Sequence, residues 1–303
     1  MVGILVVFFN DTKHIQRIAS ALSKQTIKDF RLYVLDNNPT LNHIPELKKV
    51  ITDFVEIVPK ENTGFAVGNN LLAGKAVADG CKYLWILNPD MEPEPEALES
   101  LVAFLEKNAS HIIVGPLLLL GDSKSKPKIQ LYGCEANYLN QKKKALFSGQ
   151  YLHEVNLQKE MEVNLVNGGS FLIRTEFLRN NYLFEKQYFM YNDEMDLMRR
   201  VKEARGKISV ISNAIVWHHH DWGKKNSTSY NAMYYYMMRN KMLYFFKFGN
   251  YFYAILEMFK SILLFPVIAA YCIRTNGAKL IYFYYLGVLH GLLKKKNRSS
   301  VSF

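Results

Sequence analysis

The chain has 303 residues, enough for one large domain or one domain with an appendage, and its 49% apolar and 21% charged residues are ordinary for a protein that buries a core. Its three cysteines, Cys81, Cys134 and Cys272, lie far apart without a CxxC pair, which argues against a zinc ribbon or a disulfide framework and fits a reducing compartment. The net charge of +11 is concentrated at one end, because residues 201–303 carry 15 Lys and Arg against three acids, whereas residues 1–200 carry 23 against 24.

The first half of the chain alternates between apolar runs of strand length and segments with helical spacing. The run Gly3–Phe9 has no basic leader and no small-residue cleavage site, so we expect a buried first strand rather than a signal peptide. The expected strands are Gly3–Phe9, Phe30–Leu35, Val55–Val58, Tyr83–Leu87 and Ile112–Gly115. The expected helices are His14–Ser23, one from Leu47 to Phe54, Phe65–Val77, and one that opens at Pro95 and runs through Leu105. This alternation predicts an α/β fold with a mostly parallel central sheet flanked by helices.

Polar clusters follow three of these expected strands: Asp36-Asn37, Asn62-Thr63-Gly64 and Asn88-Pro89-Asp90. Ligands of such sheets bind at the carboxyl ends of the strands, so three successive clusters suggest a nucleotide site. Each cluster alone could be turn chemistry. The sequence contains no GxGxxG and no GxxxxGK[ST] motif, which removes the main support for a dinucleotide-binding or P-loop protein.

Asp90 emerges from the apolar run that ends at Leu87. A carboxylate in this place can hold Mg²⁺ or Mn²⁺, which prefer oxygen ligands and share them with substrate phosphates. Asn88 could supply an amide to a ribose or a phosphate. The alternative is an aspartate that serves only the turn before the helix at Pro95.

The acidic segment Asp193-Glu194-Met195-Asp196 is expected to open a helix that ends near Gly206. Because Asp193 and Glu194 are adjacent, they point in different directions, and one of them could face a cleft as a general base. A structural alternative exists for all three acids, since the first turn of a helix favours negative charge. Asp196 and Arg200, four residues apart, could simply pair on the helix surface.

Three consecutive histidines, His218, His219 and His220, cannot all face one way, so they do not form a three-ligand zinc site on one element. One of them could bind a metal or a phosphate; the alternative is a loop with incidental histidines. Residues 121–160 are polar and lysine-rich and predict loops or short edge strands near the site.

Several segments follow one another in a characteristic order over roughly residues 3–240. They are Ile4–Asn10, Val34–Asn38, Glu61–Asn70, Leu87–Asp90, Asn167–Arg174, Tyr191–Arg200, His218 and Tyr236–Asn240. In this order they resemble family 2 glycosyltransferases, the inverting group with the A-type nucleotide-binding fold. The likeness is greatest to the bacterial branch that builds surface polysaccharides containing rhamnose or galactofuranose.

The resemblance implies roles for individual residues. Glu194 would be the catalytic base, with Asp193 as the neighbouring alternative, and Asp90 would bind Mg²⁺ or Mn²⁺ with help from His218. Asp36 would contact the nucleotide base or its ribose. The full set of implied donor contacts is Asn10, Asp36, Asn37, Gly64, Phe65, Asn69, Asn88, Asp90, Gly169, Arg200 and Arg239.

The reaction implied by the resemblance is sugar transfer with inversion, from dTDP-rhamnose or a UDP-sugar to a hydroxyl of a glycan acceptor, in O-antigen or capsule synthesis. A lipid-linked acceptor would suit the basic end of the chain. One alternative is a sugar-phosphate nucleotidyltransferase, which should carry a glycine-rich phosphate-binding stretch that Phe8–Thr12 lacks. The other is a basic nucleic-acid-binding protein, in which aromatic side chains stack on bases and Asp90 and Glu194 have no role.

Residues 1–240 are expected to form the catalytic domain and residues 241–303 a basic, aromatic-rich helical region. Tyr251–Ile273 is interrupted by charges and a proline, and Leu280–Leu293 is too short, so neither is a convincing transmembrane helix. Helices lying on an anionic membrane fit better and would place the protein in the cytoplasm, on the inner face of the cell membrane, with no nucleic-acid partner. Alternatively, these helices could pack on the catalytic domain or on a second subunit of a homo-oligomer.

Overall fold

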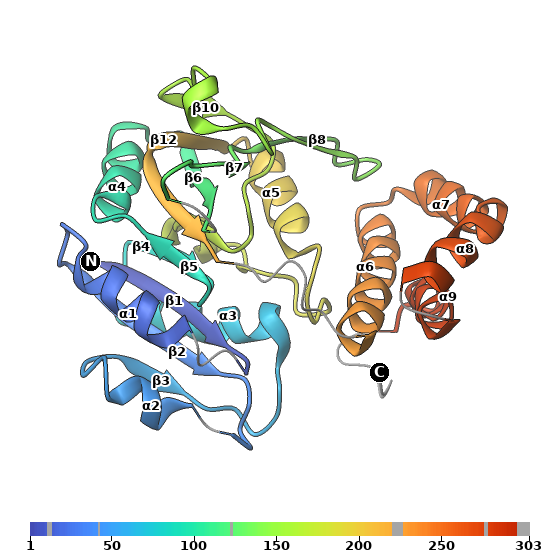
Figure 1. Ribbon diagram of the computed structural model, residues 1–303, viewed down its shortest axis with the longest axis horizontal. Coiled ribbons are helices and arrows are strands. Elements are labelled where there is room, and N and C mark those ends of the chain that lie inside the picture. Colours follow the sequence, from blue (N-terminus) through green and yellow to red (C-terminus); the bar gives the residue numbers. More distant parts are fainter. Residues whose placement is uncertain (11–13, 42, 122–123, 220–226, 276–277, 296–303) are drawn as a thin grey trace.

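A mixed β-sheet runs through the centre of the computed structural model (Figure 1), which describes residues 1–10, 14–41, 43–121, 124–219, 227–275 and 278–295. The strand order is β10-β12-β6-β11-β4-β1-β2-β3, with β5 paired to β12 and β7 to β6. Their bounds are β1 Val2–Phe8, β2 Phe30–Asp36, β3 Val55–Ile57, β4 Tyr83–Leu87, β5 Met91–Pro93, β6 His111–Leu120, β7 Ile129–Leu131, β10 Glu160–Glu162, β11 Ser170–Arg174 and β12 Lys207–His218. The pairs along β3-β2-β1-β4 and the pair β6-β12 are parallel, while β11 lies antiparallel between β4 and β6.

Helices cover both faces of this sheet. Their bounds are α1 Ile15–Ser23, α2 Ile44–Lys48, α3 Gly64–Ala78, α4 Ala97–Lys107, α5 Asp193–Glu203, α6 Ser227–Lys247, α7 Tyr251–Leu263, α8 Phe265–Thr275 and α9 Ala278–Leu292, with short 3₁₀ turns at Leu152–Glu154 and Thr175–Arg179. Alternate residues of β1 face opposite cores: Ile4 and Val6 pack with α1 and α4, whereas Leu5 packs with α3 and α5. Burial on both faces explains why β1 and β4 are continuous apolar runs.

The predicted α/β fold with a mostly parallel sheet is confirmed, and most predicted elements lie within two residues of the observed ones. The second helix was predicted wrongly. It ends at Lys48 instead of running to Phe54, and Ile51 and Phe54 pack against the core from irregular backbone, so their apolar spacing only mimics a helix. Strand β6 continues past its predicted end at Gly115. Pro116 does not end the strand, because it lies beyond the residues that pair with β11, where its missing N–H costs no hydrogen bond to that strand.

Residues 124–160 form short strands and loops, as predicted. Strand β7 joins the main sheet, and β8 (Cys134–Ala136) pairs with β9 (Lys143–Ala145) as a separate hairpin.

Helices α6 to α9 lie together beside the sheet (Figure 1). Glycines in α9 allow α6 to approach closely, since a Cβ at Gly287 or Gly291 would come within 2.5 Å of Tyr235 O or Met242 Cβ. In the part of the chain that the structure describes, no single helix is long and apolar enough to cross a membrane. Helix α7 and the start of α8 reach that length and apolar character only together, and the two are bent by 60° relative to each other. The boundary predicted at residue 240 falls inside α6, which is continuous to Lys247.

Candidate active site

Asp90 and His218 meet at one edge of the sheet. Asp90 lies between β4 and β5, and His218 ends β12, where it is paired with Met91 of β5. Oδ2 of Asp90 lies 3.1 Å from Nε2 of His218, and the backbone N–H of His219 donates to the Asp90 carbonyl at 2.9 Å. The two side chains are only 15% and 11% exposed. Strand pairing therefore brings together two of the predicted ligands.

The 3.1 Å between Asp90 Oδ2 and His218 Nε2 is the distance of a hydrogen bond or ion pair, and it also suits two neighbouring ligands of one cation. Mg²⁺ and Mn²⁺ favour octahedral coordination, and adjacent ligands at the usual Mg²⁺ bond length are about 3 Å apart. Nδ1 of His218 lies 2.8 Å from Oε1 of Gln130, a contact that fixes the ring and directs Nε2 toward Asp90. Among the described residues no cluster of three or more His, Cys, Asp or Glu side chains could hold a metal. With Asp90 and His218 as its protein ligands, a divalent cation at this place would need its remaining ligands from water and a bound phosphate.

Gly169 packs directly against Asn88. The Asn88 N–H donates to the Gly169 carbonyl at 2.8 Å, and a Cβ at Gly169 would lie 2.9 Å from the Asn88 amide nitrogen and 2.7 Å from Met91 Cε. A side chain at residue 169 would therefore require the side chains of Met91 and Asn88 to move. The preceding residue, Gly168, lies beside the Glu194 carboxylate, because its Cβ would be 3.6 Å from Glu194 Oε2. Gly168 and Gly169 thus connect the Asp90 end of β4 to α5.

Glu194 and Asp193 occupy different environments, as their adjacency predicts. Glu194 lines a cavity of about 240 Å³, and its Oε1 accepts a hydrogen bond from Lys143 Nζ at 2.9 Å. Burial acts to raise the pKa of the Glu194 carboxyl, but the Lys143 ammonium outweighs it and holds the pKa below its usual value. Asp193 is only 2% exposed, and burial raises its pKa well above the usual value. Of the two acids, Glu194 is the ionised carboxylate that faces a cavity.

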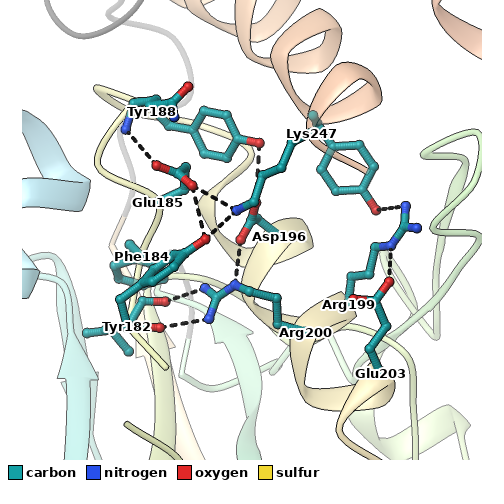
Figure 2. Close-up of polar contacts among 12 residues, drawn as sticks. Tyr182, Phe184, Glu185, Tyr188, Asp196, Arg199, Arg200, Glu203 and Lys247 are labelled. Carbon is teal, nitrogen blue, oxygen red and sulfur yellow. Dashed lines mark hydrogen bonds and ion pairs between the residues drawn. The ribbon is translucent and has the colours of Figure 1, made fainter. Parts of the chain in front are cut away.

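Asp196 lies on a different side of α5 from Glu194, in a buried ionic network (Figure 2). Its two oxygens accept hydrogen bonds from Arg200 Nε at 2.7 Å and from Lys247 Nζ at 2.5 Å. Arg200 also donates to the carbonyls of Tyr182 and Leu183 at 2.7 and 2.8 Å. These contacts hold the loop before α5 and argue against the donor contact predicted for Arg200.

Arg239 is likewise a structural link. Its side chain is fully buried in α6 and donates to the Gln187 carbonyl at 3.1 Å and to Asn240 Oδ1 at 2.8 Å. Asn240 in turn donates to the carbonyls of Met190 and Tyr191 at 2.7 and 2.9 Å. A buried guanidinium cannot reach a ligand at the sheet edge, so the geometry also argues against donor binding by Arg239.

Asp36, Asn37 and Asn10 shape the loops after β1 and β2. The buried Asp36 carboxylate accepts the N–H groups of Asn38 at 2.9 Å and His43 at 2.5 Å. Asn37 joins this loop to α3, donating to the Gly64 carbonyl at 2.9 Å and accepting from the Thr63 N–H at 2.9 Å. Asn10 accepts a hydrogen bond from the Asn38 side chain. They stand at the predicted sheet edge, and their contact with a nucleotide stays a prediction.

Gly64, Phe65 and Asn69 lie at the start of α3, against the segment that leads to α5. Gly64 has φ +78°, and a Cβ there would lie 2.3 Å from the Phe189 carbonyl oxygen. The Phe65 N–H donates to that same carbonyl at 2.8 Å. Asn69 is buried, and its amide donates to the Phe65 carbonyl at 3.0 Å. Glycine is required at residue 64 for this contact between segments, so its predicted donor role is not needed to explain it.

Three contributors to the site were not singled out from the sequence. Lys143 contacts Glu194, Gln130 contacts His218, and Asn167 Oδ1 accepts the Gly169 N–H at 2.7 Å. Gln130 and Asn167 also line a second cavity of about 460 Å³. Lys143 lies in the lysine-rich segment, and the sequence around it does not differ from that around its neighbouring lysines. Only the folded structure shows that Lys143 is the one that contacts Glu194.

The second histidine of the triplet has a separate partner. Nε2 of His219 lies 2.6 Å from Oε2 of Glu92, and Oε1 of Glu92 accepts a hydrogen bond from Lys124 Nζ at 2.7 Å. His220 lies outside the described residues. His218 alone of the two described histidines faces Asp90.

Known proteins share this fold and part of this sequence pattern. The family model for Glycosyl transferase family 2 matches residues 3–180, and no curated protein matches the chain. A solved structure of GalNAc-T7 with UDP, GalNAc and Mn2+ is similar at 15% identity and a TM-score of 0.63, covering 81% of this chain and 47% of that one. S. aureus TarS 1-349 is similar at 16% identity and a TM-score of 0.51, covering 80% and 64%. S. aureus TarS is similar at 14% identity and the same TM-score, covering 80% and 39%.

This chain therefore spans between 39% and 64% of the length of these structures. At such low identity the likeness concerns the fold, and it confirms the predicted A-type nucleotide-binding class with its mostly parallel sheet and flanking helices.

Proposed function

The chain belongs to glycosyl transferase family 2, and on this premise we propose that it transfers a sugar from a nucleoside-diphosphate donor to a hydroxyl group of a glycan acceptor. The observation that carries the proposal is the placement of two chemically distinct centres. Asp90 and His218 are in contact at the carboxyl end of the sheet. The ionised Glu194, which lies beside Gly168, faces a cavity.

We assign Glu194 the role of general base. Its carboxylate would take the proton of the acceptor hydroxyl while that oxygen attacks the anomeric carbon and the bond to the nucleoside diphosphate breaks. One displacement of this kind inverts the anomeric centre. Asp193 does not suit the role, because burial keeps its carboxyl away from the cavity and raises its pKa.

Asp90 and His218 would hold Mg²⁺ or Mn²⁺ together with the donor diphosphate. A cation bound there would neutralise the charge that develops on the leaving diphosphate. Asn88 and Gly169, which are joined by a backbone hydrogen bond at the end of β4, would offer amide and backbone groups to the donor beside Asp90. The GalNAc-T7 structure contains UDP and Mn2+, which supports the same choice of ligands here.

We further propose dTDP-rhamnose or a UDP-sugar as the donor, and a lipid-linked saccharide of bacterial surface polysaccharide synthesis as the acceptor. The support is the order of sequence segments shared with the rhamnosyl and galactofuranosyl branch, together with the C-terminal helices. Phe252, Phe259 and Ile262 lie on one side of α7 and are each more than half exposed. An anionic membrane surface on the cytoplasmic side would cover these apolar side chains while Lys260 and other basic residues meet its headgroups.

A screen of sugar nucleotides by thermal shift, with and without Mn²⁺, tests the function. We expect one nucleotide family to raise the melting temperature only when the metal is present. Release of the nucleoside diphosphate, with and without saccharide acceptors, then identifies the reaction. Stabilisation by oligonucleotides instead, with steep salt dependence, would contradict it.

The membrane proposal has its own test. Full-length protein should float with liposomes that contain anionic lipid at low salt and should bind neutral liposomes less. A protein that ignores anionic liposomes and elutes as a dimer or larger assembly would show that a second copy covers the helices.

A further inference from the structure

The hairpin formed by β8 and β9 carries Lys143 over α5. Its ammonium nitrogen lies 2.9 Å from Glu194 Oε1, and the two side chains are 37% and 24% exposed. The ammonium lowers the pKa of the Glu194 carboxyl against the effect of burial. Burial acts to lower the pKa of Lys143, but the carboxylate outweighs it and raises that pKa, so the pair is ionised on both sides.

The hairpin is anchored at both ends, so the position of Lys143 is fixed. At its base, the Cys134 N–H donates to the Leu165 carbonyl at 2.8 Å. At its tip, Tyr244 OH of α6 donates to the Tyr138 carbonyl at 2.8 Å, and the Asn250 amide donates to the Leu139 carbonyl at 3.1 Å. The hairpin therefore connects the C-terminal helices to the residue that contacts Glu194.

The two oxygens of the Glu194 carboxylate have different neighbours. Oε1 accepts the hydrogen bond from Lys143, whereas Oε2 lies beside Gly168, where no side chain fills the space. Tyr191, Met237 and Lys241 line the remaining walls of the cavity. An acceptor hydroxyl that enters this cavity would meet Glu194, whose Oε1 is already held by Lys143.

We propose that Lys143 is a positioning residue that fixes one oxygen of Glu194 and keeps the carboxylate ionised, so that the other oxygen receives the acceptor proton. This inference rests on the proposed role of Glu194 as base. Lys143 would act through the carboxylate, although its side chain also lines the cavity.

The other groups around Glu194 leave this task to Lys143. On β8, burial raises the pKa of the Cys134 thiol, which keeps it neutral. On α6, Lys241 pairs with Glu257 at 2.8 Å. On the segment before α5 and on α5 itself, burial raises the pKa values of Tyr191 and Asp193 and favours their neutral forms.

The test compares Lys143→Met and Lys143→Arg with Lys144→Met. Lys144 is the next residue of β9, and its exposed side chain pairs at 3.7 Å with Glu135, so it is a matched control for charge and strand position. The first readout is the pH profile of nucleoside-diphosphate release from the donor found by the screen. The second is the Glu194 carboxyl resonance in ¹³C-glutamate-labelled protein, identified by its loss in Glu194→Gln and titrated with acid.

Without Lys143, burial alone acts on the Glu194 carboxyl and raises its pKa. As the pH is lowered, Lys143→Met should therefore begin to lose activity at a higher pH than wild type. Turnover at its optimum should drop by about 10- to 100-fold, the usual cost of a misplaced catalytic group. Lys143→Arg should restore most of the turnover and most of the wild-type pH profile, and Lys144→Met should match wild type in both. The labelled carboxyl should titrate at higher pH in Lys143→Met.

An unmoved carboxyl titration in Lys143→Met overturns the inference whether or not a donor has been found. Retained turnover in Glu194→Gln would instead remove Glu194 from the mechanism, and a screen in which no sugar nucleotide releases its nucleoside diphosphate would refute the proposed function, so these failures are distinct.

Discussion

Nε2 of His218 lies 3.1 Å from Oδ2 of Asp90, although 128 residues separate them in the sequence. The contact depends on strand β5, which directly follows Asp90 and pairs antiparallel with the end of β12. A metal ligand pair built in this way is fixed by the sheet rather than by a flexible loop.

Asp90→Asn should weaken metal-dependent binding of a nucleoside diphosphate by at least about tenfold, because mutation of a residue that merely hydrogen-bonds to a metal ligand already lowers metal affinity by about this factor. Calorimetric titration with UDP, with and without Mn²⁺, measures the effect. Glu92→Gln is the matched control, since Glu92 pairs with His219 instead of His218. Equal loss in both variants would contradict a specific role for Asp90.

Glu194→Gln should lower sugar transfer by about 10²–10⁴-fold, the usual contribution of a general base. Donor binding should persist, because Asp90 and His218 are not among the residues that line the Glu194 cavity. Steady-state turnover and donor titration separate the two. Glu203→Gln, at the other end of α5, should behave as wild type; near-normal turnover in Glu194→Gln would remove this residue from the mechanism.

Gly168→Ala should leave the fold intact but weaken use of the acceptor. A Cβ at residue 168 would lie 3.5 Å from Glu194 Cβ and 3.6 Å from Oε2, which is ordinary contact distance. The methyl group would nevertheless occupy the space beside the proton-accepting oxygen. The KM for the acceptor should rise while the donor affinity stays the same. An unchanged acceptor KM with a normal melting temperature would show that the acceptor approaches from elsewhere.

Gly64→Ala should destabilise the protein by at least about 1–3 kcal/mol, the cost of a left-handed conformation for a residue with a side chain. The new Cβ would also collide with the Phe189 carbonyl at 2.3 Å. Gly74→Ala in the same helix is the control. Nothing lies within 4 Å of its Cβ, so it should stabilise by up to about 1 kcal/mol. Urea unfolding of the two variants should therefore give shifts of opposite sign.

Asp193→Asn should change how stability depends on pH. Burial raises the pKa of Asp193 in the folded protein, so the unfolded chain releases this proton first, near pH 4. The contribution of Asp193 to the free energy of unfolding therefore falls as the pH rises from about 4 toward the folded pKa. Asp193→Asn should remove this fall, whereas Asp53→Asn, at an exposed position, should keep it. Urea titrations at several pH values measure the difference; identical slopes in all three proteins would contradict it.

Much of the sheet could be predicted from the sequence because its central strands are buried on both faces. Such strands appear as continuous apolar runs, and β4 was located to the residue. The predicted helix after Leu47 does not form, because Ile51 and Phe54 are partly buried from irregular backbone, which local spacing cannot distinguish from a helical face.

The candidate site was only partly predictable, for a similar reason. Asp90, Glu194 and His218 stand in distinctive local segments, so each could be proposed separately. Lys143 and Gln130 contact Glu194 and His218 only through the tertiary fold, across 51 and 88 residues, and nothing in their neighbouring residues marks them. Arg200 and Arg239 show the reverse: each lies in a distinctive segment, yet its guanidinium is used within the fold.

The Lys247 contact with Asp196 also bears on where this protein can be shortened. A chain cut at residue 240 would end in the middle of α6 and discard the ammonium that pairs with a fully buried carboxylate. It would also discard Tyr244 and Asn250, and with them the attachments of the hairpin tip. The boundary predicted at residue 240 therefore cuts through contacts that hold the fold, and we expect a shortened protein to need at least the residues through Asn250.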